Sequence, residues 1–217
     1  MKKLNFETFK DYAEAAMRTA SDKQPLAPWV VEKGLSNNLL HALLGIVTEL
    51  EEIEEALYNN DEANLFEEFG DLLWFTALAF KELNMLDEAS RMLKRIYEYD
   101  IEQTTTPNDI LNAIKATMFY GKEFDMDTAV HFIFQEYYKV LHHLETVSGS
   151  MDITYRELVD YILTINIAKL KKRYPNEFND LDAVKRDLNE ERKLLEDYLN
   201  KFNRLISDGT VTDDEEL

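Results

Sequence analysis

The sequence predicts an all-α fold, and three features of its 217 residues point to it. Only six glycines and four prolines interrupt the chain, so its elements should be long. Apolar residues recur at steps of three and four in several segments, which is the period of an amphipathic helix. Runs that alternate apolar and polar residues, as strands do, are scarce. We therefore expect a helical bundle.

Two long helices are predicted in the first half of the chain. The first runs from about Leu39 to Leu57, and its apolar stripe falls at Leu39, Leu43, Ile46, Leu50, Ile53 and Leu57. Ser36, Asn37 and Asn38 are the candidate N-caps, and the polar cluster of residues 59–61 should end the helix. The second helix spans about Glu62 to Leu83. Its stretch 72–80 is apolar on nearly every side, which predicts burial among several neighbours.

Later helices carry clear start signals. Thr106 and Pro107 are a cap and a first-turn proline, and Thr154 with Glu157 forms a capping box. The helix that Thr154 opens should run to about Tyr174, before Pro175, and a final helix is expected over 181–206. We interpret residues 1–206 as one domain, with a helical insert at about 85–150, and residues 207–217 as an acidic flexible tail.

The composition limits the classes of function that the protein can have. Lys and Arg total 24 and Asp and Glu total 43, for a net charge of −19, which argues against a general nucleic-acid binder. The same charge permits a small anionic substrate that arrives with a metal ion. The absence of cysteine fits a reducing compartment. No apolar run is long enough for a membrane span or a signal peptide, so we expect a soluble cytoplasmic protein.

Paired carboxylates are the main chemical signal. Glu49 and Glu52 lie three residues apart on the first helix, and Glu68 and Asp71 repeat that spacing on the second. If the two helices are antiparallel, the four acids converge. Oxygen ligands without His or Cys favour a hard cation, so the sequence predicts a Mg²⁺ or Mn²⁺ site.

A solvated acidic face is the ordinary alternative for such a helix. The helical wheel places Glu49 and Glu68 beside their apolar stripes and turns Glu52 and Asp71 further away. Geometry alone leaves the ligands of the first helix open among Glu49, Glu52, Glu54 and Glu55.

A basic face is predicted on the helix after Thr154. Asn166, Lys169 and Arg173 are spaced three and four apart and share one face, with Lys172 one residue away. An amide followed by cations suits a ligand with a polar end and a phosphate end. The alternative is that these cations only complement the dipole at the helix C-terminus.

Around these residues the chain resembles the MazG-like superfamily of all-α nucleoside triphosphate pyrophosphatases, whose signature is ExxE followed by ExxD. The superfamily also includes dimeric dUTPases and phosphoribosyl-ATP pyrophosphohydrolases. The segments similar to bacteriophage-type MazG-like proteins occur in family order, at residues 15–20, 38–49, 67–74 and 166–175, followed by Phe178 and residues 183–188.

The resemblance implies a metal-dependent pyrophosphohydrolase that cleaves a (d)NTP to (d)NMP and pyrophosphate, in control of a nucleotide pool or signal. Mg²⁺ or Mn²⁺ would be held by Glu49, Glu52, Glu68 and Asp71, one of which would act as general base. The substrate would be bound by Asn166, Lys169, Lys172 and Arg173, with His41 as a pocket residue. Trp74 is interpreted as interior, with base stacking as the alternative.

The insert at 85–150 departs from the family pattern. Residues 116–125 resemble the end of the first acidic helix, and Phe132 and Gln135 would then stand where Glu68 and Asp71 do. The insert is therefore either a degenerate repeat of the first half or an unrelated helical segment.

Two other function classes stay open at this point. The bundle could bind and sequester a nucleotide without cleaving it, or serve as a regulatory interaction protein. The resemblance allows a homodimer and, for a phage-encoded chain, implies the host cytoplasm. The base and sugar of the substrate and the number of metal ions are not specified by these residues.

Overall fold

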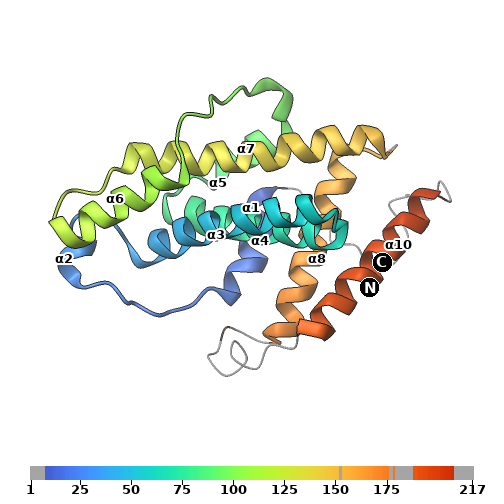
Figure 1. Ribbon diagram of the computed structural model, residues 1–217, viewed down its shortest axis with the longest axis horizontal. Helices are drawn as coiled ribbons and strands as arrows, with labels where there is room; N and C mark the ends of the chain where they lie inside the picture. The colour runs from blue at the N-terminus through green and yellow to red at the C-terminus, as the bar shows by residue number, and fades with distance from the viewer. Residues whose placement is uncertain (1–7, 152, 176–177, 179–187, 208–217) are drawn as a thin grey trace.

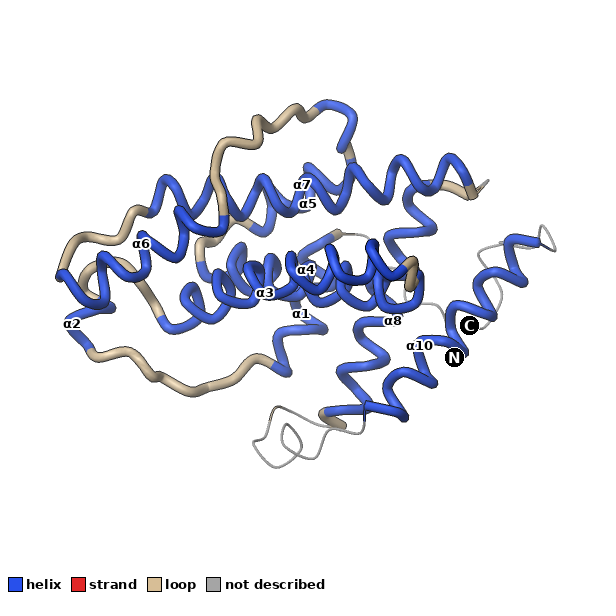
Figure 2. The backbone as a smooth tube through the Cα atoms, viewed as in Figure 1, coloured by secondary structure: helices blue, strands red, loops and turns tan. Residues whose placement is uncertain are grey.

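The computed structural model describes residues 8–151, 153–175, 178 and 188–207. Over these residues it contains nine α-helices and two 3₁₀ helices (Figure 1). No strand occurs in that part of the chain, and loops join the helices (Figure 2). The all-α prediction is confirmed. None of the described helices is both long enough and apolar enough to cross a membrane.

The helices follow one another along the chain with these bounds: α1 (Phe9–Ala16), η1 (Met17–Thr19), α2 (Pro28–Val31), α3 (Asn37–Asn59), α4 (Glu62–Glu82), α5 (Leu86–Lys94), η2 (Ile96–Glu98), α6 (Pro107–Tyr120), α7 (Met126–Ser150), α8 (Tyr155–Arg173) and α10 (Leu188–Ser207).

Helices α3 and α4 form an antiparallel hairpin, which is the condition for convergence of the four acids. The Ser36 side chain accepts a hydrogen bond from the backbone N–H of Leu39 and so caps α3. Asn60 adopts the left-handed conformation (φ 53°) that ends α3, and the Asp61 side chain caps α4 through the N–H of Asn64. Two successive polar residues, Asn60 and Asp61, therefore make the turn.

Helix α4 is the centre of the fold. It packs against α1, α3, α5, α7, α8 and α10. In the stretch 72–80 every side chain is buried except the half-buried Phe75, which confirms that this run lies among several neighbours. The carboxylates at the start of the same helix are therefore held next to the main apolar core.

Helices α6 and α7 form a second hairpin, which packs on the first in the upper layer of Figure 1. Gly121 (φ 65°) ends α6 in the left-handed conformation, and Asp125 caps α7 as Asp61 caps α4. This capping aspartate occurs at the register expected if Phe132 and Gln135 correspond to Glu68 and Asp71. The repeat stays a prediction, and the matching turns are consistent with it.

Helices α8 and α10 complete the wall beside α4. The predicted capping box of Thr154 and Glu157 opens α8, which ends at Arg173. Helix α10 packs against α8 and α4, and Phe202 stacks on Tyr161 with ring centroids 3.8 Å apart. Residues 181–187 of the expected final helix and residues 208–217 of the expected tail lie outside the described residues.

Substitution of Gly45 should test the close packing of α3 on α4. A Cβ at Gly45 would overlap the ring of Phe75, so Gly45→Ala should lower the free energy of unfolding by about 1–3 kcal/mol. Gly149 in α7 has open space around its Cβ position, so Gly149→Ala should be neutral or stabilising by up to about 1 kcal/mol. Urea unfolding of both variants measures the contrast, and equal effects would contradict it.

Candidate functional site

The turn at Asn60 sets the register of the acidic residues. Glu49 and Asp71 each lie 11 residues from Asn60, and Glu52 and Glu68 each lie 8 residues from it. In an antiparallel hairpin, residues equally distant from the turn lie side by side. The two ExxE/D pairs are therefore brought level with each other across α3 and α4.

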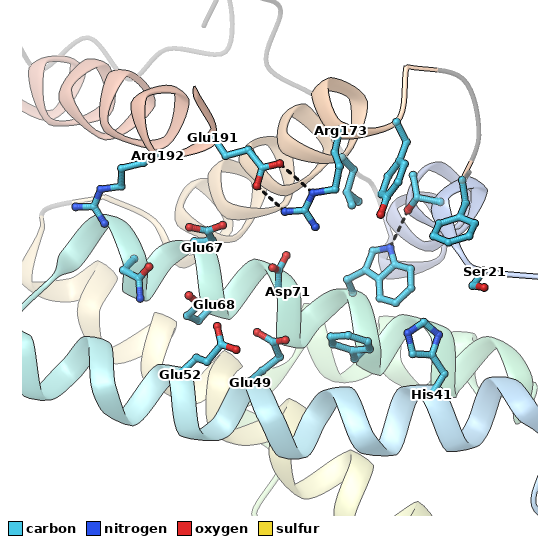
Figure 3. A pocket seen from close by; sticks show the side chains of 17 residues that line it. Ser21, His41, Glu49, Glu52, Glu67, Glu68, Asp71, Arg173, Glu191 and Arg192 are labelled. Carbon is cyan, nitrogen blue, oxygen red and sulfur yellow. Dashed lines mark hydrogen bonds and ion pairs between the residues drawn. The ribbon is translucent and has the colours of Figure 1, made fainter. Parts of the chain in front are cut away.

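Three of the four predicted acids form a tight cluster. One carboxylate oxygen each from Glu49, Glu68 and Asp71 lies within 4.8 Å of the others, and the first two residues are buried. Glu52 is exposed and lines the same pocket at its edge (Figure 3). Glu54 and Glu55 are exposed and do not line it, so the structure favours Glu49 and Glu52 among the alternatives.

Like charges in a buried place shift the acids toward their neutral forms. Burial, together with the charges of Asp71, Glu68 and Glu52, raises the pKa of Glu49 to about 9. Burial and the charges of Asp71 and Glu67 raise the pKa of Glu68 to about 7, against the opposing effect of Lys169. The raised pKa values mean that burial and like charge favour the neutral forms of both Glu49 and Glu68.

The cluster has the chemistry of a hard-cation site. Its donors are all carboxylate oxygens, and Oε2 of Glu49 is buried without a hydrogen-bond partner in the described part of the chain. A buried carboxylate oxygen without a donor is costly unless a cation or a proton satisfies it. Glu49, Glu68 and Asp71 therefore fit Mg²⁺ or Mn²⁺, and Glu52 lines the same pocket outside this cluster.

Two residues of α8 bind the carboxylate of Asp71. Asn166 donates from Nδ2 to Oδ1 of Asp71 at 2.7 Å, and the Lys169 ammonium forms an ion pair with Oδ2 of Asp71 and another with Glu67 at 3.1 Å. Burial opposes the charge of Lys169, but Asp71 and Glu67 outweigh it and raise the pKa of its ammonium. Asn166 and Lys169 are buried and do not line the pocket, so they support Asp71 where a substrate contact was expected.

Arg173 and Lys172 lie on different sides of α8. Arg173 lines the pocket, where Glu191 of α10 accepts two hydrogen bonds from its guanidinium at 2.6 and 3.0 Å. Lys172 pairs with the exposed Glu190 at 2.8 Å and does not line the pocket. The structure thus keeps Arg173 as a candidate phosphate contact and places Lys172 outside the site.

The pocket has an acidic end and an aromatic end. Its volume is about 620 Å³, and His41 lies at the end away from Glu52 and Glu68 (Figure 3). Trp74 and Phe75 also line the pocket. The His41 ring lies edge-on to Trp74 and Phe75, with centroids 5.7 and 5.5 Å away, and partial burial lowers the pKa of its imidazole. Trp74 is buried and its indole N–H donates to Thr19 at 3.2 Å, which confirms its interior placement.

Three charged lining residues were absent from the predicted site: Glu67, Glu191 and Arg192. Glu67 precedes Asp71 by one helical turn, so the i, i+4 spacing is a signal that could have identified it. Glu191 and Arg192 come from α10, and no local pattern links that helix to the acidic hairpin.

Comparisons of this chain with protein-family models, with curated proteins and with solved structures found no match. The site is therefore described by its own chemistry, which is a cluster of carboxylates that could hold a cation in a pocket that aromatic residues also line.

The raised pKa values of Glu49 and Glu68 predict how stability depends on pH without metal. A folded-state pKa above the unfolded value stabilises the fold at low pH, and this stability is lost as pH rises through the raised pKa. In EDTA the parent should therefore lose several kcal/mol of unfolding free energy between pH 5 and pH 9, since each tenfold change in proton affinity corresponds to about 1.4 kcal/mol and the pKa of each of the two carboxyls is raised by more than one such step. Glu49→Gln should flatten this dependence.

Urea unfolding across that pH range measures the effect. Glu54→Gln is the matched control, because Glu54 is exposed on the same helix and does not line the pocket. A Glu49→Gln profile as steep as that of Glu54→Gln would contradict the assigned burial of the Glu49 charge.

Proposed function

We propose that the protein is a metal-dependent nucleoside triphosphate pyrophosphohydrolase, which converts a (d)NTP and water to (d)NMP and pyrophosphate. The observation that carries the proposal is the convergence of Glu49, Glu68 and Asp71 at one end of a pocket whose other end is aromatic. A triphosphate needs cations, and a nucleobase needs flat apolar surfaces. The pocket offers a place for both.

The charge balance of the pocket supports an anionic substrate that arrives with metal. Among the described lining residues the cations are Arg173 and Arg192, and both already contact carboxylates. A bare triphosphate would be repelled by the acidic residues. Mg²⁺ or Mn²⁺, when bound by Glu49, Glu68 and Asp71, would offset the phosphate charge and make water a better nucleophile.

The chain's own residues have separable roles in this proposal. Glu52 lines the pocket outside the tight cluster, so in this proposal it would accept a proton from the attacking water. Arg173 can offer two donors to the departing pyrophosphate once Glu191 releases them. The bond between the α- and β-phosphates breaks, and the proton given up by water is returned to solvent through Glu52.

The aromatic end fits a nucleoside. The ring of His41 stands against Trp74 and Phe75, and its lowered pKa keeps the imidazole neutral at pH 7. A neutral imidazole can donate and accept hydrogen bonds at a base edge without adding charge. The pocket volume of about 620 Å³ lies within the range typical of small-molecule sites.

Hydrolysis should require the clustered acids. With a panel of NTPs and dNTPs and either Mg²⁺ or Mn²⁺, the parent should produce monophosphate and pyrophosphate, separated by anion exchange. Glu68→Gln keeps the side-chain shape but removes a ligand charge, so kcat/KM should fall by about 100-fold or more. The increase in melting temperature that Mn²⁺ gives the parent should shrink in the same variant.

Glu55→Gln is the control, since Glu55 is exposed on α3 and does not line the pocket. Survival of every nucleotide with both metals would overturn the proposed function. Full activity in Glu68→Gln would remove the acid cluster from the chemistry.

The contact between Arg173 and Glu191 should oppose substrate binding. A phosphate must replace the Glu191 carboxylate to engage both donors of Arg173, so Glu191→Gln should lower KM severalfold and change kcat less than about twofold. Glu190→Gln is the matched control, because it removes the neighbouring ion pair with Lys172, which does not line the pocket. Steady-state kinetics with pyrophosphate inhibition tests this, and equal KM values for the two variants would contradict it.

A further inference from the structure

A tyrosine of α1 is hydrogen-bonded to Asn166, the residue that in turn binds Asp71 of the acidic cluster. Tyr12 of α1 is fully buried, and its hydroxyl donates a hydrogen bond to Oδ1 of Asn166 at 2.8 Å. The other end of the same amide donates to Asp71. A continuous chain of hydrogen bonds thus runs from α1 through α8 to the carboxylate on α4.

The direction of each bond in this chain matters. An asparagine amide has an acceptor at one end and donors at the other, so only one of its two orientations presents N–H to Asp71. In that orientation the Tyr12 hydroxyl donates its proton to the carbonyl oxygen. In the flipped amide the hydroxyl could only accept from the amide nitrogen, and its own proton would lose this acceptor. In the flipped amide the carbonyl oxygen would face the Asp71 carboxylate and repel it.

The backbone of α4 holds Asn166 in place. A Cβ at Gly70 would lie 3.1 Å from Cβ of Asn166 and 3.2 Å from its Nδ2, which is closer than ordinary packing. The glycine before Asp71 therefore lets α8 approach α4 until the Asn166 amide rests on the helix backbone. Even an alanine at position 70 would require the Asn166 side chain to move by a few tenths of an ångström.

Both oxygens of Asp71 are restrained by this arrangement. Asn166 occupies Oδ1 and Lys169 occupies Oδ2, and each carboxylate oxygen has a second lone-pair direction for a cation. A carboxylate held at both oxygens cannot rotate away when the pocket is empty of cations. Such outer contacts of metal ligands commonly affect metal affinity by about 10–100-fold.

We propose that Tyr12 is a positioning residue for Asp71, acting through the orientation of the Asn166 amide and so setting the affinity of the acidic cluster for divalent cations. This inference rests on the metal site of the proposed function. Tyr12 does not line the pocket, so its effect on any substrate would pass through Asp71.

The test compares two buried tyrosines. Tyr137 of α7 is also fully buried, packs on the same Phe9 ring as Tyr12, and donates its hydroxyl to the Ala89 carbonyl at 3.2 Å. Tyr12→Phe and Tyr137→Phe each remove one buried hydroxyl, so both should lower the melting temperature by a similar amount. Titration calorimetry with Mn²⁺ well below that temperature should show a Kd about 3–10-fold weaker for Tyr12→Phe and unchanged for Tyr137→Phe.

A double-mutant cycle separates positioning from packing. Asn166→Leu removes the amide, so adding Tyr12→Phe to it should weaken Mn²⁺ binding no further. Equal Kd values for the parent and Tyr12→Phe would overturn the inference, as would additive effects in the cycle. A parent that binds Mn²⁺ but hydrolyses no nucleotide would overturn only the proposed function, whereas a parent without Mn²⁺ affinity would overturn both.

Discussion

The ion pair between Lys169 and Asp71 allows α4 to contribute both to the apolar core and to the acidic cluster. Helix α4 is buried on most sides and yet carries Glu67, Glu68 and Asp71 in its first half. Isolated charges there would cost several kcal/mol each, so an internal cation is needed. Lys169 supplies it from α8 and is itself 1% exposed, which ties the placement of α8 to the charge of the acidic hairpin.

Most of the fold could be predicted because its signals are local. Caps such as Ser36 and Thr154 act within one helical turn, and the apolar stripes report which helix faces are buried. The meeting of Glu49 with Asp71 was also predictable, since both residues belong to one hairpin with a short turn. The spacing of Asn166 and Lys169 likewise identified the face that they share.

The residues that contact this face of α8 could not be derived from the periodicity of the sequence. A helical wheel says that Lys169 and Arg173 share a side, but it does not say that one meets Asp71 while the other meets Glu191. Those partners come from α4 and α10, and their meeting depends on how the helices pack. Tyr12 and Asn166 are 154 residues apart, so no local pattern could pair them.

The second hairpin carries no acid at the two positions that the predicted repeat would match with Glu68 and Asp71. Gln135, at the position that would match Asp71, is buried and bonds to the backbone of Thr105 at 2.8 and 3.1 Å. The Gln135 amide therefore stabilises the loop before α6. A carboxylate in the matching position of α4, Asp71, belongs instead to the acidic cluster. Helices α6 and α7 therefore contribute packing against α3 and α4.

The long span of the Tyr12–Asn166 contact also has a kinetic consequence. Closing a loop of 154 residues has a large entropic cost, which is recovered only after much of the intervening chain has folded. The isolated α3–α4 hairpin contains every proposed metal ligand but lacks the groups that orient Asp71. The oriented form of Asp71 should therefore arise late in folding, when α1 and α8 have docked. A nascent chain would contain all the acidic residues before Tyr12 and Asn166 could orient Asp71.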